Sequence, residues 1–145
     1  MRRHTQFYID GQCVEPASGW REFELVDPTT EQPFASVPMG SAEDVDRAVK
    51  AARKAFPSFS TTSRAERLAL LQRIVDVFSK READFMAVAS QELGTPLSSV
   101  SHFRNAVDQF REMIKLLQDY EFEHRLGGHV VRREPIGVCG LIAPW

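Results

Sequence analysis

A continuous apolar run at residues 136–142, Ile-Gly-Val-Cys-Gly-Leu-Ile, constrains the fold of this chain more than any other feature. A half-exposed strand alternates apolar and polar side chains. This run does not alternate, which indicates a strand that is buried on both faces of a parallel sheet. Such a strand needs neighbouring strands on both sides and helices on both faces. The sequence therefore predicts an α/β fold in which this run is a core strand.

The apolar run lies close to the last residue, Trp145, and little sequence follows it that could supply the neighbouring strands. Native chains usually end in polar, exposed sequence. We therefore expect the natural sequence to continue beyond Trp145. We also expect residues 1–145 alone to expose apolar surface and to aggregate.

Charge and composition exclude several function classes. The chain carries 18 basic and 20 acidic residues, a net charge of −2, with both signs interspersed, which gives no reason to expect a nucleic-acid partner. No apolar stretch has the length of a signal-peptide core or of a membrane span, so we expect no membrane partner. Cys13 and Cys139 form no metal-type spacing, and without a secretion signal both are expected to be reduced thiols in a cytoplasmic protein.

The first forty residues predict short strands. Phe7-Tyr8-Ile9 and Gln12-Cys13-Val14 flank the pair Asp10-Gly11, which is a strong signal for a β-hairpin. Residues 23–26 and 34–38 are two further strand candidates. Together they predict a strand meander at the edge of the fold.

Two helices are predicted to follow. Ser41 to Asp44 has the form of a capping box, and Pro57 is expected to end the helix that begins there. Ser63-Arg64-Ala65-Glu66 is a full capping box that opens a second, long helix, which Gly94 is expected to end as a left-handed cap. The expected buried faces are Val45, Val49, Ala52 and Phe56 in the first helix, and Leu68, Leu71, Val75, Phe78, Phe85 and Ala89 in the second.

The third predicted helix has the most regular pattern in the chain. Its apolar residues are spaced alternately by three and four positions, which is typical of a helix that packs along one face. This apolar stripe consists of Val100, Phe103, Val107, Phe110, Ile114 and Leu117. Such a stripe indicates core or interface, not a cofactor site. After Gly127-Gly128, residues 129–133 predict an exposed or edge strand.

No residue of the chain is predicted to be catalytic. A nucleophilic cysteine needs a base or a positive environment, whereas Cys139 lies inside the apolar run and is expected to be a buried core residue. The four histidines have no metal-ligand spacing. Gly137 and Gly140 do not complete a phosphate-binding glycine loop.

Five segments, in order, resemble the aldehyde dehydrogenase family. FYIDGQCV (7–14) resembles the family's opening hairpin, and VDPTTE (26–31) is similar to its N-P-x-T-G-E turn, with Asp27 for Asn and Thr30 for Gly. SAEDVDRAVKAARKAF (41–56) is similar to its first helix. ELGTP (92–96) resembles E-x-G-K-P, with Thr95 where Lys is common. REPIGVCGLIAPW (133–145) is the most specific segment of the resemblance, which covers nearly the whole chain.

The resemblance implies an α/β fold, the N-terminal part of a Rossmann-like cofactor domain. Residues 1–126 would form the N-terminal strands and helical layer, residues 127–134 an oligomerisation strand, and residues 135–145 the first core strand of the dinucleotide-binding sheet. Ile142, Ala143, Pro144 and Trp145 would lie along the nicotinamide-ribose side of NAD or NADP. Leu25 and Val26, through their backbone, and Glu92 would bind a structural monovalent cation.

The resemblance also implies the parent activity, the oxidation of an aldehyde to a carboxylic acid by a homo-oligomer, a dimer or a tetramer. The family's nucleophilic cysteine and general-base glutamate match no position in residues 1–145, so the chain alone should be inactive. The choice of aldehyde, and of NAD against NADP, depends on positions that this sequence does not contain. The alternative function is a standalone helical interaction or oligomerisation module without catalysis, which the third helix and the edge strand would serve.

Overall fold

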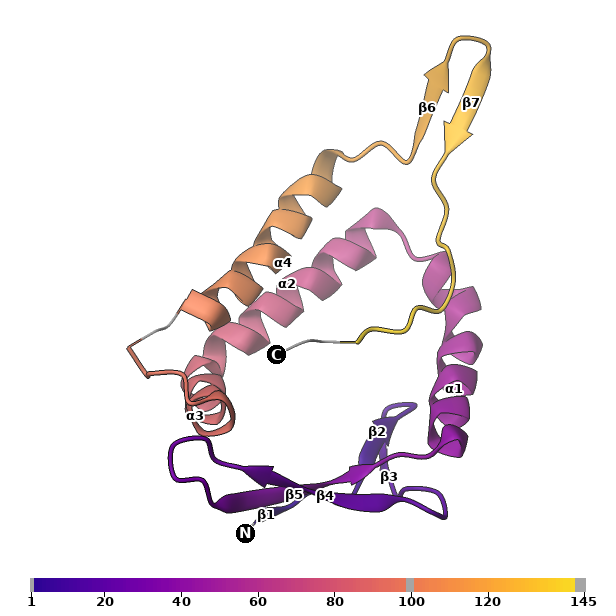
Figure 1. The fold of residues 1–145 in the computed structure, drawn as a ribbon. Coiled ribbons are helices and arrows are strands. Elements are labelled where there is room, and N and C mark those ends of the chain that lie inside the picture. Colours follow the sequence, from indigo (N-terminus) through magenta and orange to yellow (C-terminus); the bar gives the residue numbers. More distant parts are fainter. Residues whose placement is uncertain (1, 99–100, 143–145) are drawn as a thin grey trace. The chain divides into compact units, whose positions relative to one another are not determined.

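The computed structural model describes the backbone of residues 2–98 and 101–142 and the side chains of residues 3–98 and 104–142. Within these ranges the chain forms an α/β structure with four helices and short strand pairs (Figure 1). In chain order the elements are β1 (Arg2–Arg3), β2 (Phe7–Ile9), β3 (Gln12–Val14), β4 (Arg21–Val26), β5 (Pro33–Met39), α1 (Ala42–Ser60), α2 (Arg64–Lys80), α3 (Glu82–Leu93), α4 (Ser101–Asp119), β6 (Glu123–Leu126) and β7 (His129–Arg132).

The chain divides into two compact units, one of Met1–Ser60 with Ile136–Trp145 and one of Thr61–Pro135. The division at residues 126/127 and 134/135 that the sequence predicts stays a prediction. In the described ranges no helix is both long and apolar enough to cross a membrane.

The first unit begins with the predicted hairpin of β2 and β3. The register pairs Phe7 with Val14 and Ile9 with Gln12, so the two central residues of the turn are Asp10 and Gly11. Both have positive φ, 53° and 77°, which is the conformation of a type I′ turn. Asp tolerates this conformation and Gly adopts it freely. The hairpin prediction is confirmed, and the turn pair is its cause.

A second group of strands forms a three-stranded sheet in the order β1-β5-β4. The predicted strands over residues 23–26 and 34–38 are confirmed as β4 and β5, which pair antiparallel. Asp27 closes the turn between them, because its carboxylate accepts hydrogen bonds from the backbone N–H groups of Thr29 (2.7 Å) and Thr30 (3.2 Å). The central strand β5 buries Ala35 and Ser36, so the small core of this unit lies on β5.

Helix α1 follows the sheet directly and extends beyond the predicted end. Pro57 lies inside the helix, which ends at Ser60, so the prediction that Pro57 ends it is wrong. A proline removes a single N–H, and here it does so in the last turn, where one lost hydrogen bond leaves the rest of the helix intact. The hydroxyls of Ser58 and Ser60 donate to the carbonyls of Ala55 (3.1 Å) and Pro57 (3.0 Å).

In the second unit, the long helix predicted from Ser63 to Gly94 is wrong as a single element. It is two helices, α2 and α3, that meet at Arg81. Its two ends are as predicted. Ser63 and Glu66 form the reciprocal capping box, and Gly94 ends α3 with a left-handed φ of 68°. The break has no glycine or proline beside it, so its cause lies in tertiary contacts and not in the local sequence.

Helices α2 and α4 pack side by side and antiparallel (Figure 1). Arg64, in the first turn of α2, donates from Nη1 to the carbonyl of Gln118 (2.9 Å) and from Nη2 to that of Tyr120, at the far end of α4. The rings of Phe78 and Phe110 lie 6.1 Å apart. The two hydrogen bonds from Arg64 satisfy carbonyls that the end of a helix leaves without an intrahelical partner.

The predicted apolar stripe of α4 is confirmed for its described members. Val107 is buried, and Phe110, Ile114 and Leu117 are partly buried, while the residues between them are exposed. Val100 and the side chain of Phe103 lie outside the described residues. The buried side chain of α2, Val75, belongs to the face predicted for that helix.

A second hairpin, β6 and β7, follows α4, with Arg125 opposite Val130. The edge strand predicted around residues 129–133 is confirmed as β7, and its partner β6 was not predicted. The Arg132 guanidinium donates to the Glu123 carboxylate across the pair at 2.8 Å. All four side chains of β6 are exposed.

The apolar run at residues 136–142, by contrast, forms no strand in the described structure, and its place as a core strand of a larger sheet stays a prediction. Leu141 is 93% exposed and Ile142 is 96% exposed. The physical reason is that a strand exists only through hydrogen bonds to a neighbour, and the described residues offer this run no partner strand. Its composition remains that of a buried segment.

Candidate functional site

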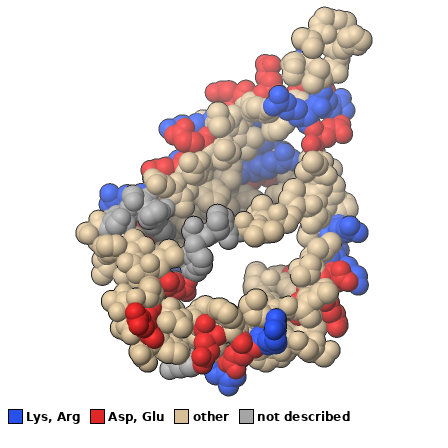
Figure 2. Space-filling view, viewed as in Figure 1, with Lys and Arg blue, Asp and Glu red and all other residues tan. Residues whose placement is uncertain are grey.

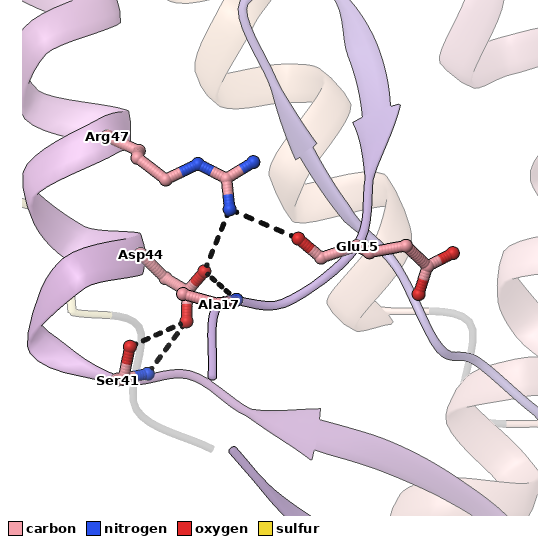
Figure 3. Close-up of polar contacts among 5 residues, drawn as sticks. All are labelled: Glu15, Ala17, Ser41, Asp44 and Arg47. Atoms are coloured by element: carbon pink, nitrogen blue, oxygen red, sulfur yellow. Dashed lines mark hydrogen bonds and ion pairs between the residues drawn. The ribbon is translucent and has the colours of Figure 1, made fainter. Parts of the chain in front are cut away.

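The most completely formed polar cluster in the described chain surrounds the carboxylate of Asp44 in the first turn of α1 (Figure 3). Asp44 is only 5% exposed. Its Oδ2 accepts from the backbone N–H (2.9 Å) and the hydroxyl (3.0 Å) of Ser41, and its Oδ1 accepts from the backbone N–H of Ala17 (2.8 Å). The Arg47 guanidinium lies 3.4 Å from Oδ1 and also donates to the carbonyl of Glu15 at 3.1 Å.

These hydrogen bonds hold the pKa of Asp44 below its ordinary value of 3.8. The Ser41 N–H contributes most, followed by the N–H of Ala17, while burial acts in the opposite direction. A carboxylate with both oxygens occupied and a lowered pKa is a poor general base. Asp44 therefore acts as a structural link, which joins the segment after β3 to the start of α1.

A second polar group lies within the β1-β5-β4 sheet. The buried hydroxyl of Ser36 donates to the Glu22 carboxylate at 2.6 Å, and the Arg3 guanidinium donates to both of its oxygens at 3.1 and 3.2 Å. The Ser36 hydroxyl first, and then Arg3, lower the pKa of Glu22. One carboxylate on β4 thus connects all three strands. This arrangement also stabilises structure and offers no free reactive group.

Of the four predicted cofactor residues, the structure describes Ile142. Ala143, Pro144 and Trp145 lie outside the described residues. Ile142 is described, in the extended apolar run, with an exposed side chain that carries no polar atom. It can touch a cofactor only by van der Waals contact or through its backbone. Its exposure is compatible with such a contact, but it forms no binding site by itself.

The predicted cation ligands belong to different units. Leu25 and Val26 are the last two residues of β4, where the pairing with β5 has a register irregularity, and both are in the first unit. Glu92 is partly buried in the last turn of α3, in the second unit. Neither unit assembles the three residues by itself. In the described ranges no group of three or more His, Cys, Asp or Glu side chains is placed to hold a metal ion.

Both cysteines are exposed, which corrects the prediction that Cys139 is a buried core residue. The reason is again the apolar run that carries it, because the part of the chain that the structure describes offers this run no partner strand. The Cys139 thiol lies 3.9 Å from the carbonyl of Gly137, an oxygen that accepts a hydrogen bond but does not take up the proton. Nothing in this contact activates the thiol.

An open apolar groove of the first unit lies between the β2–β3 hairpin and α1. Its larger part is about 380 Å³ in volume, and the Lys54–Asp10 ion pair (3.4 Å) lies beside it. The lining residues are Tyr8, Ile9, Asp10, Gly11, Ala48, Ala51, Ala52 and Ala55. The face predicted to be buried in α1 is partly uncovered here, because Val45 and Ala52 are exposed. Figure 2 shows acidic and basic side chains interspersed on the visible face, with no extended patch of one sign.

Two of these connections have no signal in the sequence. The capping-box pattern predicted the bond between Ser41 and Asp44, but no pattern links Asp44 to Ala17, 27 positions away. Likewise, the contacts from Arg64 to the end of α4 span 54 and 56 positions. Both are long-range contacts to backbone groups, which leave no periodic signal in the sequence.

Comparison with known proteins gives a consistent result. The family model described as "Aldehyde dehydrogenase family" matches residues 14–145. A 3-succinoylsemialdehyde-pyridine dehydrogenase from a Pseudomonas species is 41% identical over 148 aligned positions, which cover 100% of this chain and 31% of that protein. The chain therefore spans about a third of the length of the curated relatives that it matches.

Solved structures agree with the sequence match. Aldehyde dehydrogenase C from Pseudomonas syringae, whose structure holds NAD+ and octanal, has a TM-score of 0.86 and 38% identity over 91% of this chain and 27% of that one. An aldehyde dehydrogenase from Bartonella henselae has a TM-score of 0.84 and 31% identity over 89% of this chain and 28% of that one. The chain thus has the fold of the N-terminal part of an aldehyde dehydrogenase.

Proposed function

Because this chain belongs to the aldehyde dehydrogenase family, we propose that it serves the NAD(P)-dependent oxidation of an aldehyde to a carboxylic acid. It would supply part of the cofactor domain and not the reacting groups. The observation that carries this proposal is the similarity of sequence and fold to an enzyme crystallised with NAD+ and octanal. The nicotinamide cofactor, when bound, accepts the hydride.

The contributions of individual residues follow from the family pattern. Ile142, Ala143, Pro144 and Trp145 would line the nicotinamide-ribose side of the cofactor. Ligands in open α/β sheets lie beyond the carboxyl ends of the strands, and these residues end the apolar run, which supports that placement. The backbone of Leu25 and Val26, together with Glu92, would hold a structural monovalent cation. Oxygen donors of this type suit a hard cation.

We propose that residues 1–145 alone do not catalyse the reaction. A cysteine that attacks an aldehyde must be a thiolate, which requires a base or a positive environment near the thiol. The Cys139 thiol points to a backbone carbonyl, and the Asp44 and Glu22 carboxylates are both committed to structural hydrogen bonds. The chain's own groups instead position backbone, at the start of α1 and across the β1-β5-β4 sheet.

The partner that suits the second unit is another copy of the same protein. The β6–β7 hairpin exposes nearly all of its side chains, including Leu126 and Val130, and among the described residues these two strands pair only with each other. The outer edges of such a hairpin favour pairing with another strand. We propose a cytoplasmic homo-oligomer that associates through this hairpin.

A chimera tests the proposed function. Residues 1–145 would replace the matching N-terminal part of the Pseudomonas syringae enzyme, and reduced nicotinamide would be followed with octanal and NAD+ or NADP+. The proposal predicts aldehyde-dependent reduction, and it predicts that Asp44→Ala in the same chimera lowers thermal stability. A folded, oligomeric chimera that binds NAD+ but oxidises no aldehyde would contradict the proposal.

A further inference from the structure

The β6–β7 hairpin meets the helices of the second unit at a group of four residues, which we call the junction cluster. They are Arg64 of α2, Tyr120 and Phe122 between α4 and β6, and Arg133 directly after β7. Figure 1 shows the hairpin extending away from the end of α4. Tyr120 and Phe122 are partly buried, whereas every side chain of β6 is exposed. The hairpin is thus covered at its base and uncovered along β6.

The register of the hairpin explains why its base bonds to α2. The backbone N–H of Arg133 donates to the carbonyl of Phe122 at 2.8 Å, in register with the β6–β7 ladder. In an antiparallel pair such hydrogen-bonded positions recur at every second residue, so the next donor would be residue 135, opposite Tyr120. Pro135 has no N–H to donate. The Tyr120 carbonyl instead accepts from Nη2 of Arg64, in α2.

Side-chain contacts connect Tyr120 to the other strand of the hairpin. The Arg133 guanidinium lies 5.5 Å from the centre of the Tyr120 ring and donates from Nη1 to the Tyr120 hydroxyl. The rings of Tyr120 and Phe122 meet edge to face, with their centroids 4.9 Å apart. Tyr120 therefore contacts α2 through its carbonyl, and the end of β7 through its ring and its hydroxyl.

The neighbouring arginine has a different role. Successive side chains of a strand point to opposite faces, so Arg132 and Arg133 lie on different faces of the hairpin. Arg132 donates to the Glu123 carboxylate at 2.8 Å and lies 3.6 Å from that of Glu134, and both contacts are local to the hairpin. Of the two arginines, Arg133 is the one that reaches the junction cluster.

We propose that Tyr120 and Arg133 are positioning residues, which fix the direction in which the hairpin leaves the α2–α4 pair and meets another copy of the protein. This inference rests on the proposed association through the hairpin. An isolated two-stranded hairpin is marginally stable in water, so the contacts at its base decide how firmly it is held. Hydrogen bonds to a partner strand are directional, so they form only with a hairpin that points the right way.

The size of the effect follows from the two contacts that Arg133→Leu removes, while the backbone bond to Phe122 stays in place. An exposed cation–π contact is worth about twofold to fivefold, and a hydrogen bond about twofold to tenfold. The apparent affinity falls with the fraction of hairpins that point correctly. Arg133→Leu should therefore weaken association by roughly fourfold to fiftyfold. Tyr120→Phe loses only the hydroxyl and should weaken association by about twofold to tenfold.

Distance measurement between two spin labels tests the positioning directly. In residues 1–145 with Cys13→Ser and Cys139→Ser, labels at Ala69→Cys in α2 and His129→Cys in β7, both exposed positions, report the direction of the hairpin. An excess of unlabelled chain keeps the measured distances within one molecule.

We expect one narrow distance in the otherwise unchanged chain and in the matched control Arg132→Leu, and a broad distribution after Arg133→Leu. Circular dichroism should show the same helix content in all three. If Arg133→Leu loses helix, Tyr120→Phe, the milder variant, decides by the same broadening. A distance that stays narrow in the folded variant overturns the proposal.

Sedimentation velocity of the chimera with the Pseudomonas syringae enzyme measures the effect on association. Arg133→Leu should make the chimera dissociate at higher protein concentration, and Arg73→Leu, at an exposed position of α2, should not. Leu126→Asp with Val130→Asp changes the exposed side chains of the hairpin itself and so separates the two proposals. If this double variant associates normally, the hairpin is not the contact between copies, and the proposed association fails. If it dissociates the chimera while Arg133→Leu does not, the positioning inference alone is overturned.

Discussion

The packing of α2 against α4 can be tested by removing two methyl groups from Val107. This side chain is 4% exposed and lies on the stripe of α4 that faces α2, where Val75 is 5% exposed. Deleting two buried carbon groups costs about 1.6 kcal/mol in transfer free energy, at about 0.8 kcal/mol each. The cavity left behind adds up to about 1 kcal/mol if the helices do not close on it. We therefore expect Val107→Ala to lower the free energy of unfolding by about 1.6–2.6 kcal/mol.

The matched control is the same substitution at Val77, which is 53% exposed on α2. It should change stability by less than about 0.5 kcal/mol. Urea titration followed by circular dichroism gives the overall change, and hydrogen exchange of the α2 and α4 amides locates it in this helix pair. If Val107→Ala costs no more than Val77→Ala, the stripe does not form the core of the second unit.

Three further predictions address other elements. Gly11 has φ +77°, so Gly11→Ala should destabilise the β2–β3 hairpin by about 1–2 kcal/mol, which hydrogen exchange would detect as faster exchange of the hairpin amides. Gly128 has open space around it and no positive φ, so Gly128→Ala should not destabilise the β6–β7 hairpin. The folded state holds the pKa of Asp44 below 3.8, so as the pH falls the unfolded chain is protonated at this carboxylate before the folded chain. The free energy of unfolding should therefore fall as the pH drops through 3.8. Asp44→Asn should flatten this part of the pH profile and lower the melting temperature at neutral pH, whereas Asp46→Asn, at an exposed position, should do neither. Leu141→Ser with Ile142→Ser should reduce self-association in sedimentation velocity more than Val77→Ser does, and equal association of both variants would show that the apolar run is not the cause.

Local signals in the sequence predicted local structure well. Asp10-Gly11 fixed both positive φ values of the hairpin turn, and Ser63 with Glu66 fixed the start of α2. The three-four spacing of the α4 stripe identified the face that α2 covers. In each case the residues that carry the signal also make the contact, so their pattern is visible without knowledge of the fold.

The failures share a different cause, which is dependence on distant residues. At the break beside Arg81, Glu82 contacts Arg104 of α4, while the residues around the break favour a helix. The apolar run at 136–142 has the composition of a core strand, but a strand also needs a partner. The Asp44–Ala17 bond joins segments 27 positions apart. Periodicity and caps report none of these.

The most direct test of the proposed role measures aldehyde-dependent reduction of NAD+ and NADP+ by residues 1–145 alone. The complete Pseudomonas syringae enzyme with octanal serves as the positive control. If these residues supply framework and not reacting groups, the chain should reduce neither cofactor faster than buffer does. Sustained turnover by the purified chain, abolished by Cys139→Ser or by Cys13→Ser, would contradict the account and place a catalytic thiol within it.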